Sequence, residues 1–525
     1  MKKLITLLLF LPFLSIASPV LDNQSDTIVW SGNIELNADR FFTQQQTLKV
    51  LPGTVVTATG PYKIEIRGNI IAEGTYENPI LFTAMDTLGL SDTATITGGW
   101  HGIHLVNNLN GTGRFNYCNF EYGKANIPGS WYDYQGYHDT LAGNQGGAFR
   151  ITDFKSIAFS HCTFSYNYSR TLGGAVYFNN VNSIEITACN FLQNKTIMNG
   201  GGVYSNNYDS ILIANTSFRN NIASHVNTAQ GSAMYLYKHP GNSVTIIKDN
   251  TFFNNISLTT VFLVVPSAMV YNNLLSNNFS MYNLSFGKVE SSAYVFNNTI
   301  ANNYSWAGIP GIYSSSDDMH IYNNILWNNY SRALEDDDLV ISWHHNEPTV
   351  FNNLIWEGRA PGEAVITEDP LFANPAPGYG LDYNGWEYDW SLLDDSPAIN
   401  TGTPDTTGLH LPAFDLAGNP RVFGGRVDMG AYENQYVYLK INNSPVFNTI
   451  KLYPNPGNER MVIEILPGME GAEIEIVDGQ GKVCMHEEIR HSPMVLFPDK
   501  LAAGIYFYRV YNQTGILQSG KWVKR

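Results

Sequence analysis

One polar position recurs along most of this chain, always two residues before a bulky apolar residue. From residue 162 onward its copies are spaced 23 to 34 residues apart. The polar residues are Cys118, Cys162, Cys189, Thr216, Asn250, Asn273, Asn298, Asn324 and Asn353, and the apolar ones are Phe120, Phe164, Phe191, Phe218, Phe252, Leu275, Ile300, Leu326 and Ile355. Seven of the polar residues are followed five positions later by a further Asn, namely Asn167, Asn194, Asn221, Asn255, Asn278, Asn303 and Asn329. Self-similarity at this period predicts a solenoid in which each repeat forms one coil.

The repeats are built from strands rather than helices. Residues 183–187 and 209–213 place an apolar residue at every second position, which is the period of a β-strand. Paired glycines and clusters of Asn interrupt each repeat, as turns with permissive backbone angles require. Stacking would bring equivalent Asn residues about 4.8 Å apart, where each amide can donate to one neighbour and accept from the other. We therefore predict an all-β fold, a right-handed parallel β-helix of about eleven or twelve coils, with the Asn residues in structural roles.

The start of the chain is typical of a secretory signal peptide. Two lysines follow Met1, an apolar run extends from Leu4 to Phe13, and the small residue Ala17 marks the expected cleavage site. The apolar run is too short to span a bilayer and no other long one follows, so we expect no transmembrane segment in the mature chain. The net charge of −16 argues against nucleic acid as a partner.

Cysteine is scarce, with four residues in the whole chain, so no disulfide framework is expected. Cys118, Cys162 and Cys189 occupy the recurring polar position, where we expect buried thiols stacked along the coils. A disulfide between neighbouring coils is an open alternative, because the Cα spacing would fall near the allowed range. A shared metal ion is not expected, because stacked positions form a line rather than a tetrahedron.

Two resemblances accompany the repeats. Residues 18–114 are expected to form an N-terminal cap and the first coils. From Leu48 onward they alternate apolar and polar positions between Gly-marked turns, and this part resembles the N-terminal coils of secreted bacterial β-helix proteins of the pectin-lyase-like superfamily. Within residues 115–391, the pattern Phe-x-x-Asn alternates with Gly-Gly followed by small and apolar residues, as at 146–149, 173–176 and 200–203. This alternation is similar to the repeats of polymorphic outer-membrane proteins, a β-helical adhesin family. Both resemblances imply the same fold, the first with polysaccharide-cleaving relatives and the second with adhesive ones.

Residues 392–433 are similar to the segment that closes many secreted bacterial β-helices. We expect them to form a C-terminal cap over the open strand edges of the last coil. Arg421 and Arg426 are expected to form ion pairs there with Asp415, Asp428 and Glu433. Residues 434–448 have the composition of a linker.

Residues 449–525 alternate short strands with Gly and Pro turns, which predicts a small immunoglobulin-like β-sandwich. This segment resembles the type A C-terminal sorting domain of the type IX secretion system. The matching landmarks are Tyr453, Pro454, Asn455, Pro456, Gly504, Tyr506, Lys521 and Lys524. The resemblance implies that the secretion machinery is a partner and that the protein crosses the periplasm to the medium or the outer cell surface.

Two sets of aromatic residues are candidate ligand-binding groups. An insertion near residue 130 carries Trp131, Tyr132, Tyr134 and Tyr137, which could stack on sugar rings. Tyr177, Tyr204 and Tyr235 recur once per coil after the Gly-Gly motif. If the neighbouring aliphatic residues fill the core, these tyrosines line an exposed face; in the opposite phase, the tyrosines themselves are core.

The acidic residues suggest calcium as a possible cofactor, and no known catalytic motif is recognisable. Asp336, Asp337 and Asp338 are candidate calcium ligands on a loop, and no other cofactor is indicated. Neither the Gly-His-Gly motif of β-helical hydrolases nor the Asp-rich site with a basic residue of the lyases is evident.

We therefore expect a monomeric, secreted or cell-surface β-helix that binds a polysaccharide or a host or matrix surface in the manner of an adhesin. A polysaccharide lyase or glycoside hydrolase is the alternative, and a passive surface spacer is a second one. An enzyme requires two carboxylates, or a carboxylate and a base, in one groove. A binder requires exposed aromatic residues without such a cluster.

Overall fold

The computed structural model describes residues 26–129, 141–225, 227–238, 241–287, 293–315, 318–333, 339–341, 349–356, 362–407, 409, 411–435, 450–466, 471–512 and 515–525. The chain divides into two compact units, one up to residue 436 and one from residue 437 onward. The expected signal peptide and nearly all of the expected linker lie outside the described residues and stay predictions.

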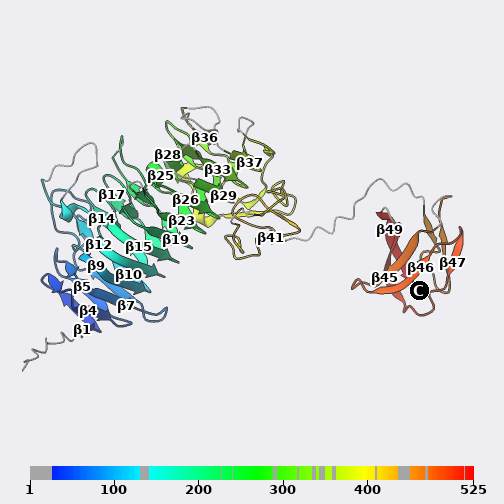
Figure 1. Ribbon diagram of the computed structural model, residues 1–525, viewed down its shortest axis with the longest axis horizontal. Coiled ribbons are helices and arrows are strands. Elements are labelled where there is room, and N and C mark those ends of the chain that lie inside the picture. The colour runs from blue at the N-terminus through cyan, green and yellow to red at the C-terminus, as the bar shows by residue number, and fades with distance from the viewer. Residues whose placement is uncertain are drawn as a thin grey trace, which may run out of the picture. The chain divides into compact units, whose positions relative to one another are not determined.

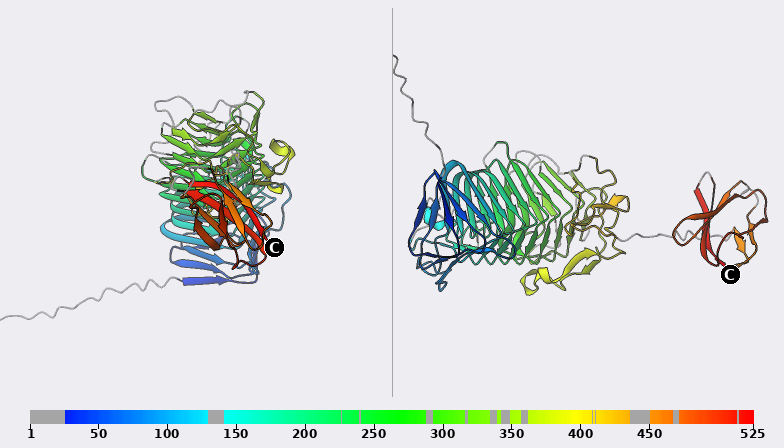
Figure 2. Two further views of the ribbon diagram at one scale, coloured as in Figure 1. Left: turned by 90° about the vertical axis from the view of Figure 1, so that its right-hand side faces the viewer. Right: turned by 90° about the horizontal axis from the view of Figure 1, so that it is seen from below.

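The first unit is a right-handed parallel β-helix, which confirms the predicted fold (Figure 1 and Figure 2). Strands of one coil pair in parallel with the equivalent strands of the next, in a sheet of 26 strands and a sheet of 12 strands. The 12-stranded sheet takes one short strand from each coil, in the order β2, β5, β8, β10, β13, β16, β20, β24, β27, β30, β34 and β38. We call it the short-strand sheet and the other the long-strand sheet.

The short-strand sheet comprises β2 (Asn33–Leu36), β5 (Val55–Ala58), β8 (Ile80–Ala84), β10 (Cys118–Glu121), β13 (Thr163–Ser165), β16 (Asn190–Leu192), β20 (Ser217–Arg219), β24 (Thr251–Phe253), β27 (Leu274–Ser276), β30 (Thr299–Ala301), β34 (Ile325–Trp327) and β38 (Leu354–Ile355). The long-strand sheet comprises β1 (Asp26–Trp30), β3 (Arg40–Phe42), β4 (Gln46–Val50), β6 (Ile64–Ile66), β7 (Asn69–Glu73), β9 (Ile103–Asn116), β11 (Lys124–Ala125), β12 (Phe149–Ser160), β14 (Tyr168–Ser169), β15 (Val176–Thr187), β17 (Lys195–Thr196), β18 (Val203–Asn206), β19 (Ser210–Ala214), β21 (Ile222–Ala223), β22 (Met234–Tyr237), β23 (Val244–Lys248), β25 (Ile256–Val264), β26 (Ala268–Tyr271), β28 (Phe279–Phe286), β29 (Ala293–Phe296), β31 (Tyr304–Ser305), β32 (Ile312–Ser314), β33 (Met319–Tyr322), β35 (Tyr330–Ser331), β36 (Leu339–Ile341) and β37 (Thr349–Phe351). A single-turn 3-10 helix, η1 (Ala142–Asn144), precedes β12.

From β10 to β34, sharp corners bound the short strands on both sides, and the corner residues adopt the left-handed backbone conformation. The φ angle is 53° at Asn272, before β27, and 55° at Asn277, after it. Asn tolerates this conformation better than most residues that carry a Cβ atom. In the later coils the corners are Asn-Asn doublets with two roles. The first Asn adopts the corner conformation, and the side chain of the second points into the coil.

The inward Asn residues form two buried amide ladders, as predicted. Asn278 illustrates the pattern: its Nδ2 donates to Asn303 Oδ1 at 3.0 Å and to the Phe252 carbonyl at 3.0 Å. Its Oδ1 accepts from both the side-chain and the backbone nitrogen of Asn255, at 2.9 and 3.0 Å. One ladder runs through Asn167, Asn194, Asn221, Asn255, Asn278, Asn303 and Asn329, and the other through Asn250, Asn273, Asn298, Asn324 and Asn353. These contacts satisfy buried polar groups that would otherwise oppose folding.

Stacked apolar side chains fill the interior beside the ladders. The rings of Phe164 and Phe191 are stacked with their centroids 4.5 Å apart, and those of Phe191 and Phe218 are 4.8 Å apart. Cys118, Cys162 and Cys189 are buried free thiols, as expected, so the alternative of a disulfide is not realised. Burial raises the pKa of the Cys162 and Cys189 thiols, which keeps them protonated.

Residues 370–435 pack against the outer face of the short-strand sheet in the later coils, and we call them the C-terminal clamp (yellow beside the green coils in Figure 2). There each short strand presents an outward apolar residue: Phe253, Leu274, Ala301, Ile325 and Leu354 pack in one cluster with Phe372, Trp390 and Met429 of the clamp. From β10 to β20 the outward residues are polar except for Leu192, namely Asn119, Glu121, Thr163, Ser165, Asn190, Ser217 and Arg219. The expected cap of residues 392–433 is thus part of a longer segment whose contacts extend along the side of several coils.

The clamp has little regular structure of its own. Its elements are β39 (Phe372–Asn374) paired with β40 (Asp389–Leu392), β41 (Val422–Phe423) paired with β42 (Arg426–Val427), and the 3-10 helices η2 (Gly380–Asp382) and η3 (Gly385–Glu387). Corner Asn residues of the β-helix hold it, since Asn277 Nδ2 donates to the Gly380 carbonyl at 3.1 Å and Asn297 Nδ2 donates to the Asp428 carbonyl at 3.0 Å.

A buried cluster of ionisable side chains lies inside the clamp. Arg421, which is 1% exposed, donates to the Gly430 carbonyl and lies 3.9 Å from Glu433. The carboxylates also accept backbone N–H groups: Asp415 from Glu433 at 2.7 Å, and Asp428 from Asn400 at 2.6 Å. The expected ion pair is therefore present between Arg421 and Glu433, whereas Arg426 donates to the carbonyls of residues 401 and 402 instead.

The second unit is a small antiparallel β-sandwich, as predicted. One sheet contains β43 (Lys451–Tyr453), β44 (Met461–Glu464) and β47 (Met494–Leu496), and the other contains β45 (Glu473–Val477), β46 (Val483–Glu488), β48 (Gly504–Asn512) and β49 (Gly515–Lys524). Its core includes Ile474, Ile476, Val510 and Trp522.

We expect Asn278→Ala to lower the free energy of unfolding of the β-helix by ~3 kcal/mol, because the partners of four buried hydrogen bonds lose their contact. Denaturant titration followed by circular dichroism measures the shift. Asn190→Ala, on the outer face of β16, is the control and should leave the midpoint nearly unchanged. Equal midpoints for the two variants would contradict the structural role of the ladder.

The clamp also predicts a pH dependence of stability. Burial raises the pKa of Glu433 from 4.5 to about 8 and that of Asp428 from 3.8 to about 6, because both carboxyls favour the neutral form there. A carboxyl whose pKa is higher in the folded than in the unfolded protein stabilises the fold fully at a pH below its unfolded pKa. This contribution is lost as the pH rises through its folded pKa. The denaturant concentration at the unfolding midpoint should therefore decrease as the pH is raised from 4.5 to 8. In Glu433→Gln, the part of this decline above pH 6 should disappear, whereas exposed Glu73→Gln should retain it.

Candidate ligand-binding groove

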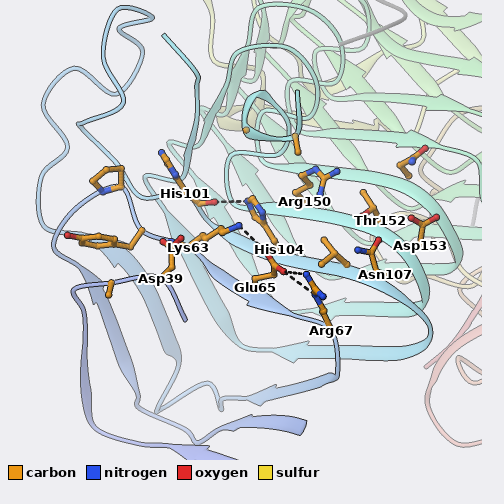
Figure 3. A pocket seen from close by; sticks show the side chains of 17 residues that line it. Asp39, Lys63, Glu65, Arg67, His101, His104, Asn107, Arg150, Thr152 and Asp153 are labelled. Atoms are coloured by element: carbon orange, nitrogen blue, oxygen red, sulfur yellow. Dashed lines mark hydrogen bonds and ion pairs between the residues drawn. The ribbon is translucent and has the colours of Figure 1, made fainter. Parts of the chain in front are cut away.

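A polar groove of about 790 Å³ lies on the outer face of the long-strand sheet in the early coils (Figure 3). Strands β6, β9 and β12 form its floor. The groups that line it include three cations and three carboxylates: Lys63, Arg67, Arg150, Asp39, Glu65 and Asp153. His101, His104, Asn107 and Asn179 add uncharged polar groups. The groove is thus balanced in charge, although the whole chain carries −16.

The parallel register brings the central residues together. Glu65 pairs with His104, and His104 pairs with Arg150, so the three occupy one outward row on successive coils. Their strand neighbours Ile64, Ile103 and Phe149 point inward and are fully buried. Side chains in one row lie about 4.8 Å apart at the backbone, so a single ligand can contact all three.

Glu65 is held as a carboxylate by two cations. Its oxygens lie 2.9 Å from Lys63 Nζ and 3.1 Å from Arg67 Nη2. Partial burial favours the neutral acid, but the hydrogen bonds and charges of Lys63 and Arg67 outweigh burial and lower the pKa of Glu65.

His104 is neutral with a defined tautomer. Burial, reinforced by the charges of Lys63 and Arg150, lowers the pKa of its imidazole to about 3. Its Nε2 lies 3.0 Å from the His101 carbonyl oxygen, which can only accept a hydrogen bond, so Nε2 carries the proton. The Nδ1 lone pair is therefore an acceptor suited to a hydroxyl group.

Arg150 is the cation without a carboxylate partner. Its Nε lies 3.5 Å from Gln145 Oε1, and no carboxylate of the described residues lies within ion-pair distance. Burial lowers the pKa of its guanidinium, which nevertheless remains charged at neutral pH. A planar guanidinium of this kind is suited to bidentate contact with a carboxylate or sulfate.

The predicted tyrosine row continues the same outward line. Arg150 pairs with Tyr177, followed by Tyr204 and Tyr235, while Val176, Val203 and Met234 fill the core. The tyrosines thus point outward, yet Tyr177 and Tyr235 are only 7% and 4% exposed. Their rings stack on one another, with centroids 5.4 and 5.1 Å apart and interplanar angles of 7° and 10°. Since the ring faces are occupied by each other, the row offers edges rather than faces to a ligand.

The remaining candidates lie outside the described residues. These are the aromatic insertion with Trp131, Tyr132, Tyr134 and Tyr137, and the calcium candidates Asp336, Asp337 and Asp338. Both sets stay predictions. Within the described ranges, no three His, Cys, Asp or Glu side chains are grouped so as to hold a metal ion.

The sequence alone did not single out Glu65 or Arg150, and gave His104 no role. A signal was present, because Glu65, His104 and Arg150 each lie between two apolar residues that face the core. The interval of 44 residues between Cys118 and Cys162 obscured the register that aligns Arg150 with His104.

The sorting landmarks come together in the second unit. Asn455 Nδ2 donates to the Lys521 carbonyl at 2.6 Å, and Asn455 Oδ1 accepts from the Val523 backbone at 3.0 Å. Trp522 Nε1 donates to the Pro454 carbonyl at 2.8 Å, and Lys524 Nζ donates to the Pro498 carbonyl at 2.6 Å. The Tyr-Pro-Asn-Pro turn thus fastens the last strand of the chain.

Comparison with known proteins supports the predicted identity of the second unit. Residues 451–525 match the family model of the secretion system C-terminal sorting domain. The chain carries a secretion-system sorting domain. The protein is therefore exported by the type IX machinery and is secreted or held at the cell surface, as predicted.

The comparisons say less about the β-helix. No curated protein matches the chain. Among solved structures, the periplasmic alginate epimerase AlgG aligns with 65% of this chain and 78% of its own, at 11% identity and a TM-score of 0.31. A match at this level adds nothing to the strand pairing described above. The helices in the described part of the chain are single 3-10 turns, none with the length or apolar composition to cross a membrane.

We expect the His104 imidazole to remain neutral, with its proton on Nε2, at every pH from 5 to 8, because its pKa is about 3. Nitrogen-15 chemical shifts of labelled histidine report both properties, and His104→Gln assigns the signal by its loss. A His104 signal that titrates between pH 6 and 7 would contradict the described environment.

Proposed function

We propose that the β-helix binds an acidic polysaccharide in the groove formed by Glu65, His104 and Arg150. The observation that carries this proposal is the half-buried Arg150 guanidinium, which has no carboxylate partner in the described residues and opens onto a groove of about 790 Å³. A carboxylate or sulfate of the polymer would supply that partner. The acceptor at His104 and the amides of Asn107 and Asn179 are suited to sugar hydroxyls.

The negative charge of the whole chain indicates that an acidic polymer would be recognised by contacts within the groove. At −16, the protein repels acidic polymers at a distance, so attraction must come from the groove itself. The sorting domain delivers the β-helix to the cell exterior, where such polymers occur. In this role the protein is an exported glycan-binding module, and adhesion to a polysaccharide-coated surface is its consequence.

A polysaccharide lyase is the second candidate, because one groove contains a carboxylate, an imidazole and an arginine that has no carboxylate partner among the described residues. The protonation equilibria favour binding over catalysis. An efficient general base has a pKa near the working pH, whereas the pKa of His104 is about 3 and that of Glu65 is lowered by two cations. Both groups are therefore weak bases.

The test mixes the purified exported protein with polygalacturonate, alginate and chondroitin sulfate, and with neutral laminarin. We expect retention of at least one acidic polymer without cleavage, weakened by added salt. Arg150→Ala should reduce the affinity at least tenfold, or about 1.4 kcal/mol. The matched control Arg114→Ala removes an exposed arginine paired with Glu73 outside the groove, and should bind normally.

Two other outcomes have distinct meanings. New unsaturated or reducing sugar ends that depend on His104 or Arg150 would establish the lyase instead. Equal retention by Arg150→Ala and Arg114→Ala, or no retention of any polymer, would contradict the proposed groove.

A further inference from the structure

The clamp is held by a row of corner asparagines that bind its backbone. These residues follow the short strands, one per coil. Asn302 Nδ2 donates to the carbonyls of Ala376 and Gly378, at 2.7 and 2.9 Å, and Asn277 Nδ2 donates to the carbonyls of Gly378 and Gly380, both at 3.1 Å.

Asn254 completes the occupied part of the row. Its Nδ2 donates to the Tyr383 carbonyl at 2.8 Å, and its Oδ1 accepts from the Gly385 N–H at 3.1 Å. Residues 376–385 therefore lie lengthwise along the row, crossing from one coil to the next. Each corner amide contacts main-chain groups of this segment and none of these contacts involves its side chains, so the row recognises polypeptide backbone.

The same row continues beyond the clamp. Asn220, Gln193 and Tyr166 occupy the equivalent corners of the preceding coils, with φ angles of 56°, 53° and 54°. Exposure rises along the row: Asn254 is 4% exposed under the clamp, whereas Tyr166 is 44% exposed. In the described chain, the side-chain amides of Asn220 and Gln193 make no hydrogen bond.

A groove of about 420 Å³ follows this open stretch. It is lined by Tyr166, Gln193, Asn220 and Asn254 along its floor, and by Leu381 and Asn384 of the clamp at one end. The groove is thus continuous with the site that the clamp already fills. Lys195 is the one charged side chain that lines it.

We propose that this groove binds a peptide segment of a partner protein, whose backbone would continue along the same row of corner residues beyond residues 376–385. Asn220 and Gln193 contact its main-chain groups as Asn277 and Asn302 contact those of the clamp. Lys195 favours a segment that carries an acidic side chain. The site lies on a different edge of the coil from the Arg150 groove and does not depend on the proposed glycan binding.

The probe is a fluorescent peptide with the sequence of residues 376–385, Ala-Pro-Gly-Tyr-Gly-Leu-Asp-Tyr-Asn-Gly, which this row already binds within the chain. Fluorescence anisotropy with the full-length exported protein should show saturable binding. Combining Asn220→Gly with Gln193→Gly should raise the dissociation constant at least fivefold. Glycine removes both amides and tolerates the positive φ, so the fold is retained.

Asn215→Gly is the matched control, because Asn215 occupies the opposite corner of the same short strand with a φ of 51°. It should bind the peptide normally. Replacing the Asp of the peptide with Asn should weaken binding, because Lys195 then loses its charge partner. Absence of saturable binding, equal binding by the double variant, or displacement of the peptide by an acidic polysaccharide would each overturn the proposal.

Discussion

The buried amide ladder is the interaction on which the rest of this β-helix depends. In the ladder that contains Asn278, each central Asn donates two hydrogen bonds and accepts two, and its partners lie on the coils directly before and after it. A shift of one residue in any coil would leave several buried polar groups without partners, at a cost of about 1–3 kcal/mol for each. From Asn167 onward the ladder therefore fixes the register of successive coils as well as stabilising them, whereas strand pairing alone aligns the earlier coils.

Fixed register turns the outer surface into a set of rows. Glu65, His104 and Arg150 meet because their strands pair in register, although 85 residues separate the first from the last. The corner asparagines form a second row for the same reason. The residues of an outer row are thus spaced by the distance between successive coils, and each coil contributes one residue of the row to a groove.

Burial then decides the chemistry of each row. His104 is kept neutral by burial beside two cations, whereas Glu65 is kept ionised because the same neighbourhood supplies Lys63 and Arg67. Within the clamp, where carboxylates outnumber arginine, burial instead raises the pKa of Glu433. Similar side chains thus differ in charge state because their immediate neighbours differ.

The sequence by itself determined the coil, the ladder positions, the inward phenylalanines, the buried thiols and the sorting domain. All of these repeat or match at short range, and local periodicity is enough to reveal them. The tertiary structure alone decided which surface residues come together. Arg150 follows an insertion that hides its register. The change from Arg219 to Phe253 at equivalent outward positions of successive coils is explained only by the clamp that covers Phe253. Such contacts depend on pairing between distant segments, which no local pattern encodes.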